Sequence, residues 1–225
     1  MGATMVNTIL DKAQTILQDP DGTRWSKAEL VGWVNSAYTE IVNARPDATA
    51  ASQTFKCEAG ITQVLTDQFP QALRLLEVDR NVASASTGAM VRLIERGVLT
   101  SQVRDWPTET PSDTVEFYMF DPKLPREFMV YPPATADAEL EVVFSSVPEN
   151  HDPANISADE TIKVPDSYAN VILDYVLYRA YSKDAEYAAN AQRAAAHFEA
   201  VQFALGTKAK TDTAVTPRDE SPAKR

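Results

Sequence analysis

The stretch from residue 164 to residue 206 constrains the fold more than any other part of the sequence. Between Pro165 and Gly206 it has no helix-breaking residue, and its apolar side chains recur at helical spacing. Its first half is apolar around most of its girth, as a buried helix is, and residues 182–184 interrupt this pattern. The second half carries an apolar seam typical of helix packing, and Gly206 fits a C-terminal cap. These features predict two helices, or one long helix with a break near Asp184.

The composition is that of a folded, acidic protein. The 225 residues have ordinary apolar and charged fractions, and their formal net charge is -11. A surface this acidic does not neutralise phosphates, which argues against general nucleic-acid binding. Cys57 is the only cysteine, so no internal disulfide forms, as suits a reducing cytoplasm. The sequence shows no signal peptide and no apolar run long enough to span a bilayer, so we expect a soluble protein without membrane contact.

Two further helices are expected near the N-terminus. Apolar residues at helical spacing predict a helix over residues 6–17, and the proline and glycine of residues 18–22 predict a turn after it. Ser26 and Glu29 match a capping box, which predicts a second helix running to about Ala44. Together these elements are typical of a helical hairpin.

The middle of the chain reads as a series of short strands. Apolar and polar residues alternate there, and prolines separate the segments. The last three predicted strands, at residues 115–120, 127–131 and 138–144, follow one another closely and suggest an antiparallel meander.

We therefore predict an α+β fold in which a helical bundle carries an inserted antiparallel β-rich domain. Residues 1–50 form the N-terminal hairpin of the bundle, and residues 164–207 form its two C-terminal helices. The β-rich insertion covers residues 51–163. Residues 208–225 lack periodicity and are expected to form an extended, flexible tail.

The sequence predicts no catalytic, metal or cofactor site. His151 and His197 are the only histidines, and neither has a catalytic partner at local spacing, so both are interpreted as structural. Residues 19–22, DPDG, faintly resemble a calcium loop, but a proline separates the carboxylates and a plain turn fits better. The chain has no glycine-rich phosphate loop. We do not expect an enzyme.

Aromatic residues of the helices, with one arginine, are candidates for the bundle core or for a protein interface. Tyrosine and arginine are enriched at interfaces, although most of these side chains are expected in the core. If buried, Arg179 would need a carboxylate, and an ion pair with Asp174 or Asp184 is the favoured interpretation. The candidates are Trp25, Trp33, Tyr168, Tyr175, Tyr178, Arg179 and Tyr187.

Several short runs, in a fixed order, carry a resemblance to a known family. They are GTRWS at 22–26, RPDA at 45–48, FDP at 120–122, VYPP at 130–133 and DYVLYRAYSKDAEYA at 174–188. Together they resemble the head-to-tail adaptor, or neck, proteins of tailed bacteriophages. The similarity covers nearly the whole chain up to about Leu205, and the last residues lie outside it.

The resemblance implies a structural protein of the virion neck, made in the host cytoplasm. Such adaptors form a ring, typically of twelve copies, beneath the portal protein. The ring extends the DNA channel and is the platform for a tail or nozzle protein, while the genome passes through without sequence-specific binding. The C-terminal tail would order on docking to the portal, and the β-rich insertion would face the next tail component. Candidate portal contacts are Lys210, Val215, Pro217, Arg218, Lys224 and Arg225.

Two other classes of function stay open at this point. One is a helical module that binds another protein as a monomer or dimer. The other is a hydrolase carried by a phage, against which the shortage of histidines and the lack of a placed carboxylate pair both weigh.

Overall fold

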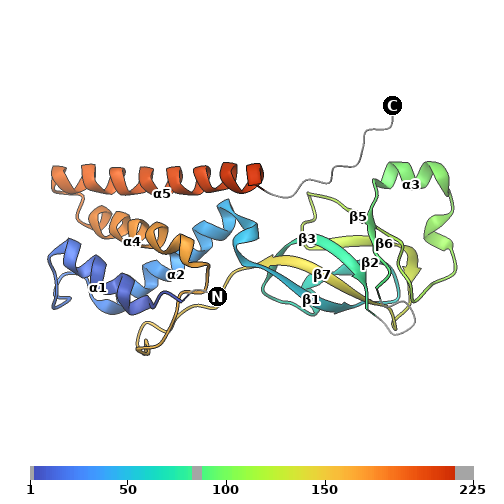
Figure 1. Cartoon of the computed structure of the whole chain (residues 1–225), viewed down its shortest axis with the longest axis horizontal. Helices are drawn as coiled ribbons and strands as arrows, with labels where there is room; N and C mark the ends of the chain where they lie inside the picture. The colour runs from blue at the N-terminus through green and yellow to red at the C-terminus, as the bar shows by residue number, and fades with distance from the viewer. Residues whose placement is uncertain (1–2, 83–87, 216–225) are drawn as a thin grey trace. The chain divides into compact units, whose positions relative to one another are not determined.

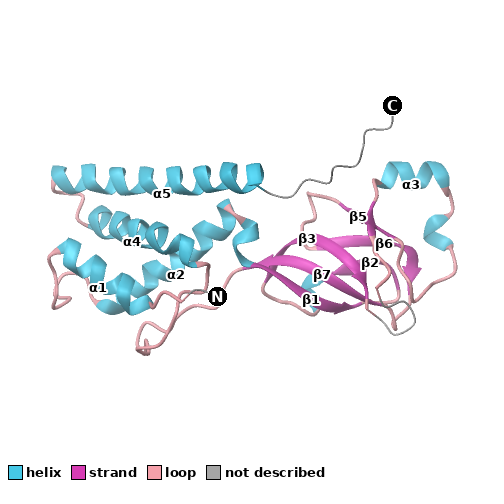
Figure 2. Ribbon diagram, viewed as in Figure 1, coloured by secondary structure: helices cyan, strands magenta, loops and turns pink. Residues whose placement is uncertain are grey.

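The computed structural model describes residues 3–82 and 88–215 of the protein, with side chains described as far as Thr207. The backbone divides into two compact units (Figures 1 and 2). The helical unit comprises Met1–Arg45 and Glu149–Arg225, and the β unit comprises Pro46–Pro148. Within the described residues the chain has five α-helices and two sheets with mainly antiparallel pairing, which confirms the predicted α+β class.

The helical unit is built around one central helix. Its helices are α1 (Val6–Leu17), α2 (Lys27–Ala44), α4 (Ala169–Lys183) and α5 (Ala188–Val215). Helix α4 lies between α5 and the two N-terminal helices (Figure 1), and α1 and α2 pack mainly on α4 rather than on each other. The predicted helices at 6–17 and from 27 to 44 are confirmed, as is the break near Asp184.

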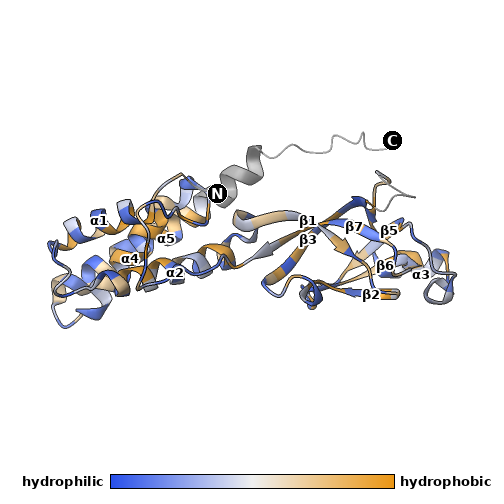
Figure 3. Ribbon diagram, turned by 90° about the horizontal axis from the view of Figure 1, so that it is seen from below, coloured by the Kyte–Doolittle hydropathy of each residue, from blue (hydrophilic) through white to orange (hydrophobic). Residues whose placement is uncertain are grey.

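The sequence of α4 explains its central place. Ile172, Val176 and Ala180 are fully buried and recur one turn apart, and further apolar residues lie on the other sides of the helix. Figure 3 shows the apolar residues of this unit gathered where α4 meets its neighbours. A helix apolar around most of its girth is stable only when other helices cover it, as α1, α2 and α5 do here.

The predicted end of the last helix at Gly206 is wrong. Helix α5 continues through Gly206 to Val215, and its 28 residues compare with 15 in α4. At 1.5 Å per residue, α5 is about 42 Å long, and its C-terminal part runs well past the N-terminal end of α4 (Figure 1). One glycine inside a helix costs only about 1 kcal/mol, and good helix formers lie on both sides of it. Residues 208–215 of the predicted extended tail are therefore helical, and residues 216–225 lie outside the described part.

The β unit consists of two sheets. The first has the order β1 (Ala50–Lys56), β7 (Glu139–Ser146), β3 (Ala72–Asn81). The second has the order β2 (Gly60–Val64), β6 (Glu127–Ala134), β5 (Phe117–Phe120), β4 (Arg92–Leu93). Helix α3 (Arg96–Gln102) follows β4.

The predicted meander of the last three strands is wrong. Strands β5 and β6 pair in antiparallel fashion as expected, but β7 pairs with β1 and β3 in the other sheet. Buried and less buried residues alternate along β6 and β7, so one face of each strand lies in the interior. The two strands belong to different sheets, and both contribute to the core between the sheets.

Aromatic and branched side chains from both sheets make one shared core. The rings of Phe55 on β1 and Phe128 on β6 meet edge to face with centroids 5.6 Å apart. Phe69 stacks on Phe144 of β7 at 4.7 Å. Cys57 is buried at the edge of this cluster, and desolvation raises the pKa of its thiol to about 12. The two sheets therefore pack face to face over a dry interior.

A buried amide side chain joins distant segments of the β unit. Asn81 ends β3 and is fully buried. Its Nδ2 donates to the carbonyls of Ala89 and Val115 at 2.9 and 2.8 Å, and its Oδ1 accepts from the N–H of Val115 at 2.8 Å. All the hydrogen-bonding atoms of this side chain are thus satisfied by backbone groups, which links β3 to the segment that leads into β5.

Candidate interaction surface

One end of the helical unit carries a cluster of arginines and aromatic rings, and the turn between α1 and α2 positions it. The carboxylate of Asp19 accepts the backbone N–H groups of Thr23, Arg24 and Trp25, each at 2.9 Å. The bond from the N–H of Trp25 is the main cause that lowers the pKa of Asp19. Gly22 has a φ of +64°, which its lack of a Cβ permits. The DPDG segment is therefore a tight turn, as predicted.

This turn delivers Arg24 and Trp25 to the end of α4. Trp25 is buried, and its Nε1 donates to the carbonyl of Ala180 at 3.3 Å. Arg24 lies over the Trp25 ring at 5.1 Å and over the Tyr187 ring at 5.9 Å. Its Nε is 2.5 Å from Oδ2 of Asp184, the residue that follows α4. The guanidinium thus both stacks on aromatic faces and pairs with a carboxylate.

A second arginine stacks nearby on another ring. Arg193 in α5 lies over the Tyr181 ring of α4 at 5.5 Å. The Tyr181 ring also stacks on the ring of His197, with the centroids 5.8 Å apart. Nδ1 of His197 is in turn 2.9 Å from Oδ1 of Asp174. Sequence patterns did not single out Arg193, because an isolated arginine on a helix is normally a solvated side chain.

The two arginines line a shared cavity. Its volume is about 410 Å³, and it opens between the end of α1 and the start of α5. The lining residues are Ile16, Leu17, Gln18, Arg24, Trp25, Tyr181, Asn190 and Arg193. The first turn of α5 has no acidic residue. We call this cavity the arginine pocket.

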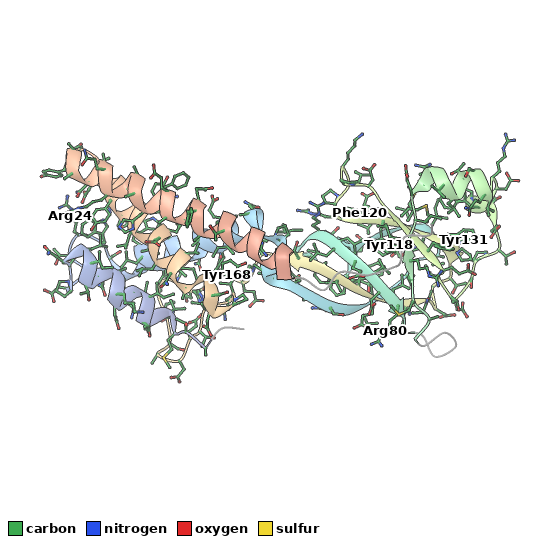
Figure 4. The ribbon with its side chains drawn as sticks, turned by 45° about the horizontal axis from the view of Figure 1, so that its top comes forward. Arg24, Arg80, Tyr118, Phe120, Tyr131 and Tyr168 are labelled. Atoms are coloured by element: carbon green, nitrogen blue, oxygen red, sulfur yellow. The ribbon has the colours of Figure 1, made fainter. Side chains whose placement is uncertain are left out.

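The aromatic residues predicted from the sequence divide between core and surface. Trp25, Tyr168 and Tyr175 are buried, while Trp33 and Tyr178 are half-buried. Tyr168 lies at the start of α4, away from Arg24 (Figure 4). Arg179 and Tyr187 are exposed, and Tyr187 keeps 64% of its surface accessible. Of the seven candidates, only these last two are exposed.

The predicted ion pair of Arg179 is wrong. Asp184 pairs with Arg24, and Asp174 pairs with His197. Arg179 is exposed on α4, where its Nη1 donates to the hydroxyl of Tyr175 at 3.4 Å. Because the guanidinium stays in water, it does not need the carboxylate that burial would demand.

The predicted portal contacts cannot be placed as side chains. The backbone of Lys210 and Val215 belongs to α5, and their side chains lie beyond the described ones. Pro217, Arg218, Lys224 and Arg225 lie outside the described residues. Their role in docking stays a prediction.

His151 is a buried structural residue. Its Nε2 is 2.7 Å from the hydroxyl of Tyr38 on α2, and its Nδ1 contacts a carboxylate oxygen of Glu160. An Nδ1–H that donates to Glu160 leaves Nε2 to accept the Tyr38 O–H, and the Tyr38 oxygen accepts from the N–H of Lys163 at 3.2 Å. Asn35 bonds the backbone of His151 in both directions. This network attaches the segment before α4 to α2.

The network predicts a dependence of stability on pH. The pKa of Glu160 lies below its ordinary value of 4.5, chiefly because it accepts the hydrogen bond from His151. A carboxylate with a lowered pKa contributes stability above its unfolded pKa and loses it as pH falls through the folded value. We expect urea unfolding of wild type and Glu160→Gln, followed by circular dichroism, to differ at pH 7 and to converge as pH falls through the lowered pKa of Glu160. Two parallel pH profiles would contradict this role of the ionised carboxylate.

The β unit has a cavity of its own. It is about 400 Å³ in volume and lies between α3 and strands β2, β5 and β6. Met119, Phe120, Phe128 and Met129 contribute apolar walls, and the remaining lining includes the charged residues Glu95, Arg96, Asp121 and Glu127. Met90 and Leu93 are exposed in the same unit, at 61% and 65%. Isolated exposed apolar residues are common, but these two are close in sequence and lie at a sheet edge.

Neither a metal centre nor a membrane span is found in the described residues. Over residues 3–82 and 88–215, no group of three or more His, Cys, Asp or Glu side chains is arranged to hold a metal ion. Within the same ranges, no helix is both long and apolar enough to cross a membrane.

Comparison with known proteins gives a match over almost the entire chain. The model of the family described as SU10 adaptor protein matches residues 6–221. No curated protein matches the chain significantly. The matched region includes both units and all the helices and strands described above.

Proposed function

The chain belongs to the SU10 adaptor protein family, and from this premise we propose that it is the head-to-tail adaptor of a tailed phage. In this role, twelve copies of the chain form a ring beneath the portal, and the ring extends the DNA channel. It offers a platform to a tail or nozzle protein in the virion neck. The family match over residues 6–221 is the single observation that carries the proposal.

The charge of the chain supports a channel role. The β unit holds eight basic and fifteen acidic residues, a formal charge of -7, and the whole chain carries -11. Binding to DNA without sequence preference depends on cations that replace counterions at the phosphates. An acidic wall lets DNA pass because it offers few such cations.

The shape of α5 supports a docking role for the C-terminal residues. Val201 and Leu205 are buried, whereas Phe203 keeps 75% of its surface exposed. Beyond Leu205 the helix continues for ten more residues, past the N-terminal end of α4. We propose that this part of α5, with residues 216–225, docks on the portal, and that Lys210, Val215, Pro217, Arg218, Lys224 and Arg225 supply contacts. The β unit faces the tail component.

Contacts between neighbours in a ring are heterologous, so each copy uses two different surfaces. Exposed Arg179 and Tyr187 on the helical unit and Met90 and Leu93 on the β unit are suited to them, because they lie outside the cores of their units.

Deletion of residues 210–225 is expected to abolish portal binding and to leave the helical unit folded. The buried residues Val201 and Leu205 are retained in this variant, so its circular dichroism should remain helical. Electron microscopy of protein mixed with portal complexes, beside protein alone, measures the association. A variant with residues 210–225 in scrambled order keeps their composition and should also fail to bind.

The outcomes separate the alternatives. A ring stacked on the portal supports the adaptor role. Unchanged binding of the deletion variant contradicts docking through the C-terminal residues. If the folded full-length chain does not associate with competent portals, the adaptor role is wrong, and a helical protein-binding module becomes the better interpretation.

A further inference from the structure

A cavity with mainly apolar walls lies between α1 and α4 on the helical unit. Its volume is about 400 Å³, and it is lined by Thr8, Asp11, Lys12, Thr15, Ile16 and Leu173. Ile16 is 46% exposed there, and Leu173 is half-buried. Lys12 lies one turn before Ile16 on α1, and among the described side chains no carboxylate forms an ion pair with it. This cavity, which we call the α1 groove, thus offers apolar surface beside an exposed cation.

The outer face of α5 has a complementary character. Ala194, Val201 and Leu205 are buried on the side of α5 that packs on α4, and the opposite side of the helix is exposed. Phe203 keeps 75% of its surface accessible, and an aromatic ring this exposed is typical of an interface. The outer face consists of Gln192, Ala195, Ala196, Glu199 and Phe203, which recur at helical spacing and include a single charge.

The two surfaces match in charge and in spacing. Glu199 precedes Phe203 by one turn of α5, and Lys12 precedes Ile16 by one turn of α1. When α5 of one copy lies antiparallel to α1 of another with Glu199 opposite Lys12, Phe203 falls over the groove, one turn on the N-terminal side of Lys12. In the same register the small side chain of Ala195 leaves room for the exposed Ile16.

The charges and the arrangement of the helices favour a second copy of the chain as the occupant. Asp11 lies beside Lys12 in the lining, so the groove would repel a segment with several carboxylates, whereas the α5 face carries one. Helices α1 and α5 pack on opposite sides of α4 (Figure 1). Each copy can therefore offer its α5 face to one neighbour and its groove to another, which is the heterologous contact that a ring requires.

We infer that the outer face of α5 packs into the α1 groove of a neighbouring copy, with Phe203 over the groove and Glu199 paired with Lys12. The inference rests on the ring proposed above and specifies one of its contacts. Apolar burial of the ring supplies most of the affinity, and the ion pair sets the register.

The test is disulfide trapping between two versions of the full chain, mixed at about 1 mM so that a contact with a Kd of that size is populated. One version carries Ala196→Cys and the other Thr15→Cys, both at exposed positions that the register places opposite each other. The native Cys57 is buried and the pKa of its thiol is raised to about 12, so it does not compete at neutral pH. Mass spectrometry distinguishes mixed from like pairs.

In a glutathione redox buffer, we expect the mixed pair to link about tenfold or more faster than a control pair, because the contact holds the two thiols close together. The control replaces Thr15→Cys by Ser182→Cys, an exposed position of the same unit outside the groove. Phe203→Ala in the Ala196→Cys version should slow linking about tenfold. Its circular dichroism should match that of wild type, since the ring is 75% exposed.

Charge reversal tests the register. Glu199→Lys in one version, or Lys12→Glu in the other, should slow linking about fivefold, because like charges then face each other. The two reversals together should restore the rate to within about twofold. Linking no faster than in the control pair, no effect of Phe203→Ala, or no restoration by the double reversal would each overturn the inference.

The result is separable from that of the portal experiment. Linking by a chain that does not associate with competent portals would support the contact and contradict the adaptor role. A ring on the portal, built from the two cysteine versions, that does not link would support the adaptor role and overturn this contact. Loss of portal binding in Phe203→Ala with unchanged linking would assign the α5 face to the portal instead.

Discussion

Replacement of Asn81 by aspartate is expected to lower the free energy of unfolding of the β unit by about 3–5 kcal/mol. The new carboxylate would face the carbonyl oxygens of Ala89 and Val115, to which Nδ2 of Asn81 donates. The carbonyl of Val115 would lose its donor, the carbonyl of Ala89 would keep only the backbone N–H of residue 81, and a charge would be buried without a cation. Urea unfolding monitored by tryptophan fluorescence, with Trp106 buried in this unit, measures the change.

The pH dependence of this variant identifies the cause. A buried, unpaired carboxylate has a raised pKa, and its protonated form can donate to one of the two carbonyls. The defect should therefore shrink as pH falls through the raised pKa of the new carboxyl group. Asn170→Asp is the control, because Asn170 is exposed on α4 and the same change there should alter stability by less than about 0.5 kcal/mol. A defect that is small, or that is insensitive to pH, would contradict the role assigned to Asn81.

Local signals in the sequence predicted the helices well, because a helix is specified by its own residues. Ser26 caps α2 as its pattern predicts, with Oγ accepting the N–H of Glu29 at 3.3 Å. The prediction that the last helix ends at Gly206 was wrong, because it used the local signal of one residue alone. The preference of glycine for a helix cap is weaker here than the preference of the flanking residues for helix.

The pairing of strands was harder to predict from the sequence than the helices. Alternation of apolar and polar residues specifies which face of a strand is buried, but not which strand lies beside it. Strands β5, β6 and β7 were found near their observed positions, but β7 pairs with β1, far earlier in the chain. Only the fold shows that Asn81, at the end of β3, bonds Ala89 and Val115.

The sequence named Trp25 and Tyr187 among its aromatic candidates, but it did not name Arg24, the arginine that stacks on both rings. Asp184, one of the two carboxylates considered as a partner of Arg179, instead pairs with Arg24. Arg24 is distant in sequence, but the turn held by Asp19 carries it to the C-terminal end of α4. Spacing along one helix does not reveal such a partner. The arginine pocket follows from this turn.

Replacement of Trp25 by alanine is expected to lower the free energy of unfolding of the helical unit by about 3–5 kcal/mol. The indole is 5% exposed, donates to the carbonyl of Ala180 and supports Arg24 on its face. Its loss would open a cavity and leave that carbonyl without this donor. Thermal and urea unfolding followed by circular dichroism at the helix band give the change.

Two further variants distinguish a core residue from an interface residue. Trp25→Phe keeps most of the apolar contact but loses the N–H, so it should cost less than the alanine variant, with about 1 kcal/mol due to the hydrogen bond. Tyr187→Ala removes an aromatic ring that is 64% exposed, and it should change stability by no more than about 1 kcal/mol. Equal effects of Trp25→Ala and Tyr187→Ala would contradict the division of these aromatics between core and surface. If that division holds, a loss of ring assembly in Tyr187→Ala would report on a contact and not on unfolding.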